Sequence, residues 1–199
     1  MTARSDATNA AEAVENRDRL LAAFEERVSP LGVRVERAES SVEVARFLAG
    51  LSREINAPRV TISAELVTNA PGFAAALTAE GIEWRSPEEV SEARDAPLGV
   101  SLAKLAIAET GSFLLNEPGL LDRAVGLMSK VHVALVPIGA LVPSLDEAAG
   151  VLRRIAQRPG GGYASLVTGP SRTADIEMSL TVGVQGPEIE IVLFVDRLD

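Results

Sequence analysis

One segment of the sequence gathers groups that could bind an anion: residues 168–177, TGPSRTADIE. Hydroxyl side chains flank a Gly-Pro turn, and Arg172 adds a planar cation that suits a carboxylate or a phosphate. The segment follows a predicted apolar strand, and open α/β sheets bind ligands beyond the carboxyl ends of their strands. We therefore expect an active or ligand-binding site here, with Ser171, Arg172 and Thr173 in contact with the ligand.

Two carboxylates of this segment have alternative interpretations. Asp175 and Glu177 are two positions apart, so they point to the same side only if the backbone is irregular or extended. In that case both could serve the site. In the alternative, Ser171 or Thr173 caps a helix, and the two carboxylates favour its positive end.

A second candidate site follows another apolar stretch, at Glu109 and Thr110. A buried, unpaired carboxylate is costly, so Glu109 needs either a partner or a solvent-lined pocket. Such a group can act as an acid, a base or a nucleophile, and we take Glu109 as the candidate catalytic residue. In the alternative, the segment is a turn in which Gly111 supplies backbone freedom.

The only histidine, His132, lies in an apolar stretch whose alternation puts it on the same side as Ala134 and Val136. We interpret it as a structural histidine with its hydrogen bonds satisfied.

The composition excludes several classes of protein. A net charge of −9 argues against a nucleic-acid surface, which needs clustered Lys and Arg. The absence of cysteine excludes disulfides and cysteine-ligated zinc or iron–sulfur clusters in this chain, and a single histidine leaves no His-rich metal site. No Walker or dinucleotide glycine pattern is present. The sequence lacks a secretory signal and an apolar run long enough to span a membrane, so we expect a cytoplasmic protein.

Hydrophobic periodicity predicts helices that alternate with strands. A long first helix is expected over residues 7–28 and a second from Ser40 or Ser41 to Glu54, followed by a strand at 58–63 and a helix at 72–79. Apolar strands are expected at 102–108, 112–115, 131–136, 164–167 and 190–195. This alternation is typical of a parallel sheet covered by helices. In the second helix we expect these residues to face inward: Val42, Ala45, Phe47, Leu48 and Leu51.

A further helix is predicted to begin after Ser144. The sequence Ser144-Leu145-Asp146-Glu147 matches a capping box, in which the Ser144 side chain accepts a hydrogen bond from the first turn. Three arginines follow near the end of the helix that favours cations.

The C-terminal half, about residues 97–196, resembles the LUD domain family. The likeness is carried by residues 106–112 (AIAETGS), 131–134 (VHVA), 142–145 (VPSL), 168–177 and 183–187 (GVQGP). The family pattern usually has His where this chain has Gln185. The N-terminal half matches only in the order of its helices and strands.

This resemblance implies a three-layer α/β/α fold similar to the NagB/RpiA/CoA-transferase-like superfamily. It divides the chain into an N-terminal helical extension, residues 1–30, and one LUD-like domain, residues 31–199. It also implies a subunit of a system that oxidises L-lactate to pyruvate beside iron–sulfur partner subunits. We expect a small carboxylate or an anionic cofactor of unknown identity to bind Thr110, Ser171, Arg172, Thr173, Asp175 and Glu177.

Two other functions remain open. Glutamate is the nucleophile in CoA-transferases of similar fold, so Glu109 could instead serve an independent enzyme that acts on an acyl-CoA or folate-like substrate. The chain could also be a structural assembly subunit that uses its long N-terminal helix.

Overall fold

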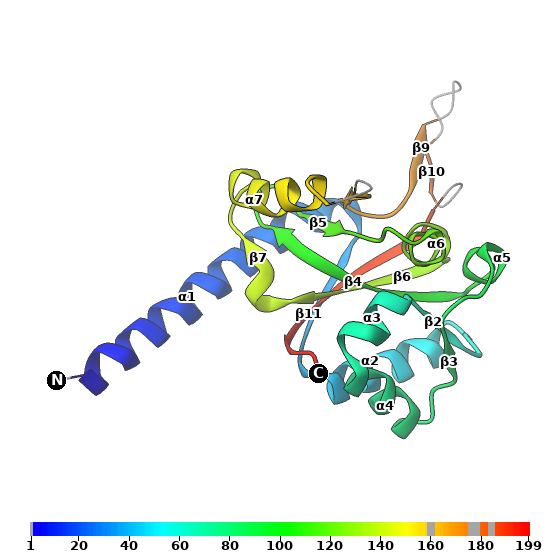
Figure 1. The fold of residues 1–199 in the computed structure, drawn as a ribbon, viewed down its shortest axis with the longest axis horizontal. Helices are drawn as coiled ribbons and strands as arrows, with labels where there is room; N and C mark the ends of the chain where they lie inside the picture. The colour runs from blue at the N-terminus through cyan, green and yellow to red at the C-terminus, as the bar shows by residue number, and fades with distance from the viewer. Residues whose placement is uncertain (1, 159–161, 175–179, 183–185) are drawn as a thin grey trace.

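The structure is a computed structural model that describes residues 2–158, 162–174, 180–182 and 186–199. It has three layers, with a mixed β-sheet between two layers of helices (Figure 1). The predicted α/β/α fold is therefore confirmed. No helix in these residues is long and apolar enough to cross a membrane.

The centre of the sheet is parallel, as the alternation of elements predicts. Its strand order is β1 (Arg34–Ser40), β11 (Ile189–Arg197), β6 (Val131–Pro137), β4 (Leu98–Ile107), β2 (Val60–Ile62) and β3 (Trp84–Arg85). An irregularity between Ala103 and Leu105 interrupts the register of β4. The second half of β4 pairs with β5 (Ser112–Leu115) on both sides of this irregularity and with β7 (Leu141–Val142) beyond it, and β5 pairs with β8 (Ser165–Val167).

One face of the sheet is covered by α2 (Ser41–Glu54), α3 (Ala64–Asn69) and α4 (Pro71–Ala79). The core on this face, here called the first core, includes Leu48, Leu66, Phe73, Val133 and Leu193, all fully buried or 1% exposed. Trp84, the only tryptophan of the sequence, packs against it and donates a hydrogen bond from Nε1 to Thr78 Oγ1 at 3.1 Å.

The predicted inward face of α2 is partly wrong. Val42 is 44% exposed, whereas Ser41, Val44, Ala45, Leu48 and Leu51 are buried. The buried stripe therefore begins at Ser41, whose hydroxyl donates a hydrogen bond to Oδ1 of the last residue, Asp199, at 2.7 Å.

The other face carries α1 (Thr2–Val28), the 3-10 turns η1 (Ser29–Leu31) and η2 (Ile138–Ala140), and α6 (Leu120–Met128). The helix α7 (Leu145–Ala156) packs on Leu105, Ile107 and Leu114, on the opposite side of β4 and β5 from α1. The core on the face that carries α1, here called the second core, joins Phe24 and Val28 of α1 to Phe113, Ala134 and Phe194. The rings of Phe24 and Phe194 meet edge to face, with centroids 5.3 Å apart. The short helix α5 (Val90–Arg94) packs on α6.

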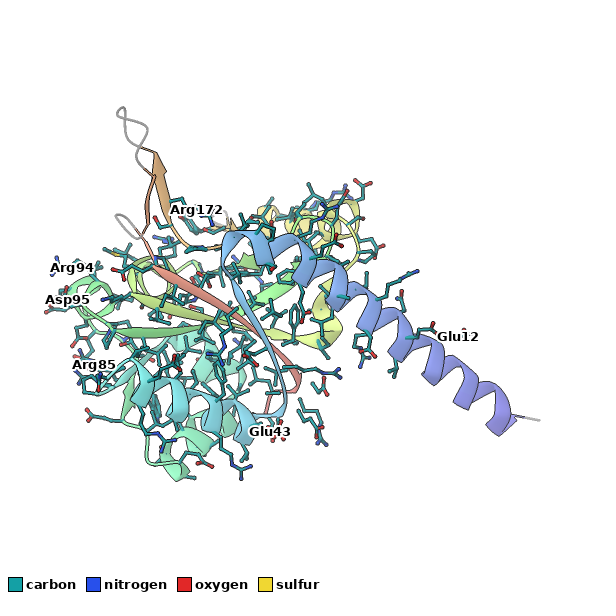
Figure 2. All side chains as sticks on the ribbon, turned by 180° about the vertical axis from the view of Figure 1, so that it is seen from behind. Glu12, Glu43, Arg85, Arg94, Asp95 and Arg172 are labelled. Atoms are coloured by element: carbon teal, nitrogen blue, oxygen red, sulfur yellow. The ribbon has the colours of Figure 1, made fainter. Side chains whose placement is uncertain are left out.

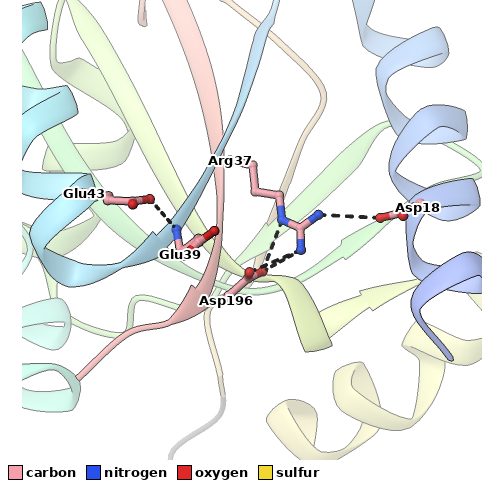
Figure 3. Close-up of polar contacts among 5 residues, drawn as sticks. All are labelled: Asp18, Arg37, Glu39, Glu43 and Asp196. Carbon is pink, nitrogen blue, oxygen red and sulfur yellow. Dashed lines mark hydrogen bonds and ion pairs between the residues drawn. The ribbon is translucent and has the colours of Figure 1, made fainter. Parts of the chain in front are cut away.

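Two elements project from this body (Figure 1). The first part of α1 extends away from the three layers. Arg37 of β1 anchors the helix at Asp18, 3.5 Å away, and also binds Asp196 of β11 (Figure 3). The second projection is a separate two-stranded sheet of β9 (Arg172–Ala174) and β10 (Leu180–Val182).

Candidate functional site

The predicted anion-binding segment forms a strand and not the start of a helix. After the turn, Arg172–Ala174 is extended as β9 and pairs antiparallel with β10. The predicted apolar strand before the segment is present as β8, which pairs only with β5 among the described strands and is not buried, since Leu166 is 47% exposed. The backbone around Thr173 is therefore extended. Asp175, Glu177 and Gln185 lie outside the described residues.

Hydrogen bonds hold the segment at three points. The hydroxyls of Thr168 and Ser112 are 2.8 Å apart, and the N–H of Ser171 donates to the carbonyl of Pro187 at 2.9 Å. Arg172 is exposed, and its Nη2 donates to the carbonyl of Leu31 at 2.7 Å (Figure 2). One nitrogen thus orients the guanidinium group, whose remaining donors suit a carboxylate or a phosphate.

Glu109 lies at the surface, at the start of α7. Its Oε2 accepts a hydrogen bond from the N–H of Leu145 at 3.1 Å, and its own N–H donates to the carbonyl of Pro143 at 3.0 Å. The sequence analysis expects Glu109 to have a partner or a solvent-lined pocket. The structure gives it a partner, the N-terminus of α7. Ser144 is the N-cap as predicted, but its side chain makes no capping hydrogen bond.

Thr110 and Gly111 complete the turn after Glu109. Thr110 Oγ1 accepts from the N–H of Ser112 at 3.3 Å, and Gly111 adopts φ +66°. A Cβ at Gly111 would lie 2.6 Å from Val28 Cγ1, so this turn lies against the end of α1. No contact among the described residues joins Glu109 to Arg172. That the two residues bind one ligand stays a prediction.

A different set of ionisable groups is buried on the same side of the sheet as the second core. His132 of β6 and Glu190 of β11 are neighbours in the parallel register, and both are 0% exposed. His132 Nδ1 and Glu190 Oε1 are 2.7 Å apart. The predicted side of His132 is confirmed, since Ala134 and Val136 lie in the second core and Val133 lies in the first.

Glu117, which follows β5, joins this pair as a third buried ionisable group and is 2% exposed. The helix α6 passes it at Gly126, where a Cβ would lie 3.3 Å from Glu117 Oε2 and 3.4 Å from Ser101 Oγ. A side chain at position 126 would crowd the carboxylate. We call Ser101, Glu117, His132 and Glu190 the buried acid–base cluster.

Burial and charge shift the pKa values of this cluster. Burial raises the pKa of Glu117 to about 7, although the nearby His132 charge opposes the shift. Burial also disfavours the charged form of His132, but the carboxylates of Glu190 and Glu117 outweigh it and raise the pKa of the imidazole. The cluster can therefore exchange a proton near neutral pH.

The hydrogen bonds of the cluster are incomplete among the described residues. These buried atoms have no hydrogen-bond partner there: Ser101 Oγ, Glu117 Oε1, His132 Nε2 and Glu190 Oε2. Buried polar groups are nearly always paired, so four unpartnered atoms in one cluster are unusual. The described residues include no set of three His, Cys, Asp or Glu side chains placed to hold a metal ion.

The sequence gives weak signals for this cluster. Glu190 lies within a predicted apolar strand. Its burial depends on whether helices cover both faces of that strand, which the local sequence does not reveal. Glu117 comes two positions after a predicted strand, whereas Glu109 follows its strand directly, and no glycine is next to Glu117. The pairing of His132 with Glu190 joins residues 58 positions apart and depends on the strand order.

Gly186 links the anion-binding segment to the helix that passes the buried cluster, α6. A Cβ at Gly186 would lie 2.9 Å from Ser171 Cβ and 3.3 Å from the carbonyl oxygen of Leu127. Leu127 directly follows Gly126, which faces Glu117. Gly186 thus lies between Ser171 and α6, next to the turn of α6 that faces the cluster.

Comparison with known proteins connects these features to a family. The family model described as the LUD domain matches residues 21–195, so the match begins within α1 and includes the N-terminal half. Lactate utilization protein C of Bacillus subtilis (strain 168) is 32% identical over 124 residues, which cover 58% of this chain and 50% of that protein. Lactate utilization protein C of Geobacillus kaustophilus is 35% identical over 105 residues, with coverage of 50% and 42%.

The chain spans about half the length of the curated relatives it matches. Among solved structures, a DUF162 family protein from Deinococcus radiodurans aligns with a TM-score of 0.60 over 90% of this chain and 98% of that chain. At 23% sequence identity, this likeness supports the fold alone.

Proposed function

Because the chain belongs to the LUD domain family, we propose that it acts in lactate utilization, as a subunit that binds a small carboxylate or an anionic cofactor. The observation that carries this proposal is the match to relatives named lactate utilization protein C. Those relatives are about twice the matched length, so the activity is proposed for this chain and not transferred from them.

Arg172 is the proposed anion contact. Its guanidinium group is exposed, and the carbonyl of Leu31 orients it through one nitrogen. The hydroxyl of Ser171 is next to it in the chain, at the point where the segment docks on Pro187. A fixed guanidinium fork beside a hydroxyl suits the carboxylate of a small organic acid. Thr110, Thr173, Asp175 and Glu177 remain proposed ligand contacts.

Iron–sulfur subunits are the proposed partners. Such clusters are held mainly by cysteine thiolates, which this sequence does not contain, so the proposal places the clusters in other chains. The projecting part of α1 supports an assembly role, because it offers a surface outside the three layers (Figure 1). We propose that this part of α1 contacts a partner subunit.

Arg172→Ala tests the proposed ligand site. We expect L-lactate or pyruvate to raise the melting temperature of the parent chain, because a ligand that binds only the folded state stabilises it. The substitution should weaken binding at least tenfold, since it removes a charge-assisted hydrogen bond. Arg153→Ala, at an exposed arginine of α7, is the matched control and should bind like the parent. Equal binding by the Arg172 variant and the parent would refute the assignment.

A further inference from the structure

A pocket with a volume of about 300 Å³ lies beside the starts of β2 and β4 and is bounded by α5. This volume is at the lower end of the range for ligand pockets, so it suits a small molecule. Figure 2 shows Arg85 and Asp95, two of its lining residues, at one edge of the molecule and apart from Arg172. The polar side chains that line the pocket are Arg59, Thr61, Arg85, Ser91, Glu92 and Asp95.

The strand register turns Thr61 and Arg85 toward the pocket. The two residues are neighbours in the parallel pairing of β2 with β3. Val60 and Ile62 lie in the first core, so the residue between them points to the other face of the sheet. Trp84 packs on the first core, and by the same alternation Arg85 points away from it. Adjacent strands therefore supply one wall of the pocket.

Two guanidinium groups act on one carboxylate in this wall, that of Glu92. Arg85 Nη1 is 2.5 Å from Glu92 Oε1, and Oε2 accepts from the N–H of Glu88 at 2.8 Å. That N–H holds the pKa of Glu92 below its usual value, and the charges of Arg85 and Arg59 lower it further. Glu92 is therefore ionised at neutral pH, with both oxygens occupied. One positive charge of the three groups is not neutralised among them.

The other acids near the pocket leave the donors of Arg59 available. Asp95 is held by Arg94 through hydrogen bonds of 2.8 and 3.0 Å. Glu83 is 3.6 Å from Arg59 Nη1, which is too far for a hydrogen bond, and its side chain is 70% exposed. Exposed ion pairs of this kind contribute little to stability. The described contacts of the Arg59 guanidinium group include no hydrogen bond, so a ligand can use its N–H groups.

We propose that Arg59 and Arg85 bind the carboxylate of a small monocarboxylic acid in this pocket. The N–H fork of a guanidinium group matches a carboxylate in geometry, and a single excess charge matches a monoanion. A phosphate dianion would place a second negative charge beside the acids of the pocket, which disfavours it. Pro58 and Pro97 line the pocket and offer apolar contacts to the body of the acid. The site does not involve Arg172, so it does not rest on the proposed function.

Amide signals can locate the bound acid. We would titrate the ¹⁵N-labelled full chain with propionate at pH 7 and constant ionic strength, with sodium chloride as the reference salt. The N–H signals of Thr61, Arg85 and Ser91 should shift to saturation with propionate and not with chloride. Inorganic phosphate should bind severalfold more weakly than propionate, because the neighbouring acids repel it. Phosphate that bound as tightly as propionate would overturn the choice of a carboxylate.

Variants at an exposed ion pair separate the pocket from the general charge of the chain. Arg59→Gln should weaken propionate binding roughly tenfold, because it removes charge-assisted hydrogen bonds. Arg59→Lys keeps the charge without the fork and should weaken binding severalfold. Arg46→Gln, at an exposed pair with Glu80 on α2, is the matched control and should bind like the parent. Equal binding by the Arg59→Gln and Arg46→Gln variants would overturn the inference.

The position of the shifted signals distinguishes this inference from the proposed function. Arg172→Ala should leave the propionate response of the pocket unchanged. Propionate shifts at Thr61 and Arg85, together with unchanged lactate binding by the Arg172 variant, would keep the pocket and remove the Arg172 site. Lactate binding that depends on Arg172, together with pocket signals that propionate does not move, would keep the proposed function and overturn the inference.

Discussion

Glu117 is the residue at which burial and acidity conflict most directly. Its pKa is raised from 4.5 to about 7, so between these values the folded chain keeps a proton that the unfolded chain has released. The free energy of unfolding therefore falls as the pH rises through this range. A shift of this size corresponds to about 3 kcal/mol of stability that is present at acid pH and lost above neutrality.

Glu117→Gln should remove this dependence, because the amide resembles the protonated acid and carries no charge at any pH. We expect the variant to be more stable than the parent at pH 8, by about 1–3 kcal/mol, and similar to it at pH 5. Urea denaturation at the two pH values measures both differences. Glu188→Gln, at an exposed position, serves as the control. An equal loss of stability at both pH values would contradict the argument.

At the residue scale, sequence reasoning could place His132 on the correct side of its strand but not identify its partners. Alternation along a strand is a local property, and it held for Ala134 and Val136. Glu190 and Glu117 come to His132 through strand order and through the chain after β5, which no local pattern encodes. Arg172 stays a predicted ligand contact, proposed because a turn with hydroxyls and a cation is a local motif. Its bond to Leu31 spans 141 positions and was not predictable.

At the scale of elements, the N-terminus of α7 differs between the sequence pattern and the structure in which side chain caps it. The capping-box pattern predicts that Ser144 satisfies the first turn, whereas the structure gives the N–H of Leu145 to the carboxylate of Glu109. A carboxylate at a helix N-terminus also favours the positive end of the helix dipole. The sequence pattern places the start of the helix correctly, because the helix depends on the spacing of nearby apolar residues. The acceptor comes from the end of another strand, at Glu109.

Two substitutions test which cap acts. Glu109→Ala should destabilise the chain by about 1 kcal/mol, because it removes both the hydrogen bond and the charge at the helix end. Ser144→Ala should lower the stability by only a few tenths of 1 kcal/mol, since the Ser144 side chain makes no capping hydrogen bond. Thermal unfolding of the two variants side by side gives the comparison. If Ser144→Ala costs more than Glu109→Ala, the sequence pattern describes the cap better than the structure does.

At the scale of the whole molecule, α1 has a packed part and a projecting part. Its final turns place Phe24 and Val28 in the second core, while Arg37 fixes the helix at Asp18 (Figure 3). The first part of α1 projects from the body (Figure 1). The proposed boundary at residue 30 therefore separates an extension whose last turns are packed against the rest of the chain.

Two truncations distinguish these parts. Removal of residues 1–16 should leave the melting temperature within a few degrees of the parent and weaken the binding of iron–sulfur subunits in a pull-down. Removal of residues 1–28 should destabilise the chain by several kcal/mol, because it deletes a buried phenylalanine and a buried valine. Full partner binding by the shorter truncation would rule out the proposed contact through the projecting helix.

The sheet that divides the molecule also divides its natural spectroscopic probes. Trp84 packs on the first core and His132 lies among residues of the second, and each is the only residue of its kind in the sequence. Indole fluorescence therefore follows the layer of α2, α3 and α4, while imidazole resonances follow the layer of α1 and α6. Coincident unfolding curves from the two signals would mean that both layers melt as one cooperative unit, and separated curves would assign an order to their loss.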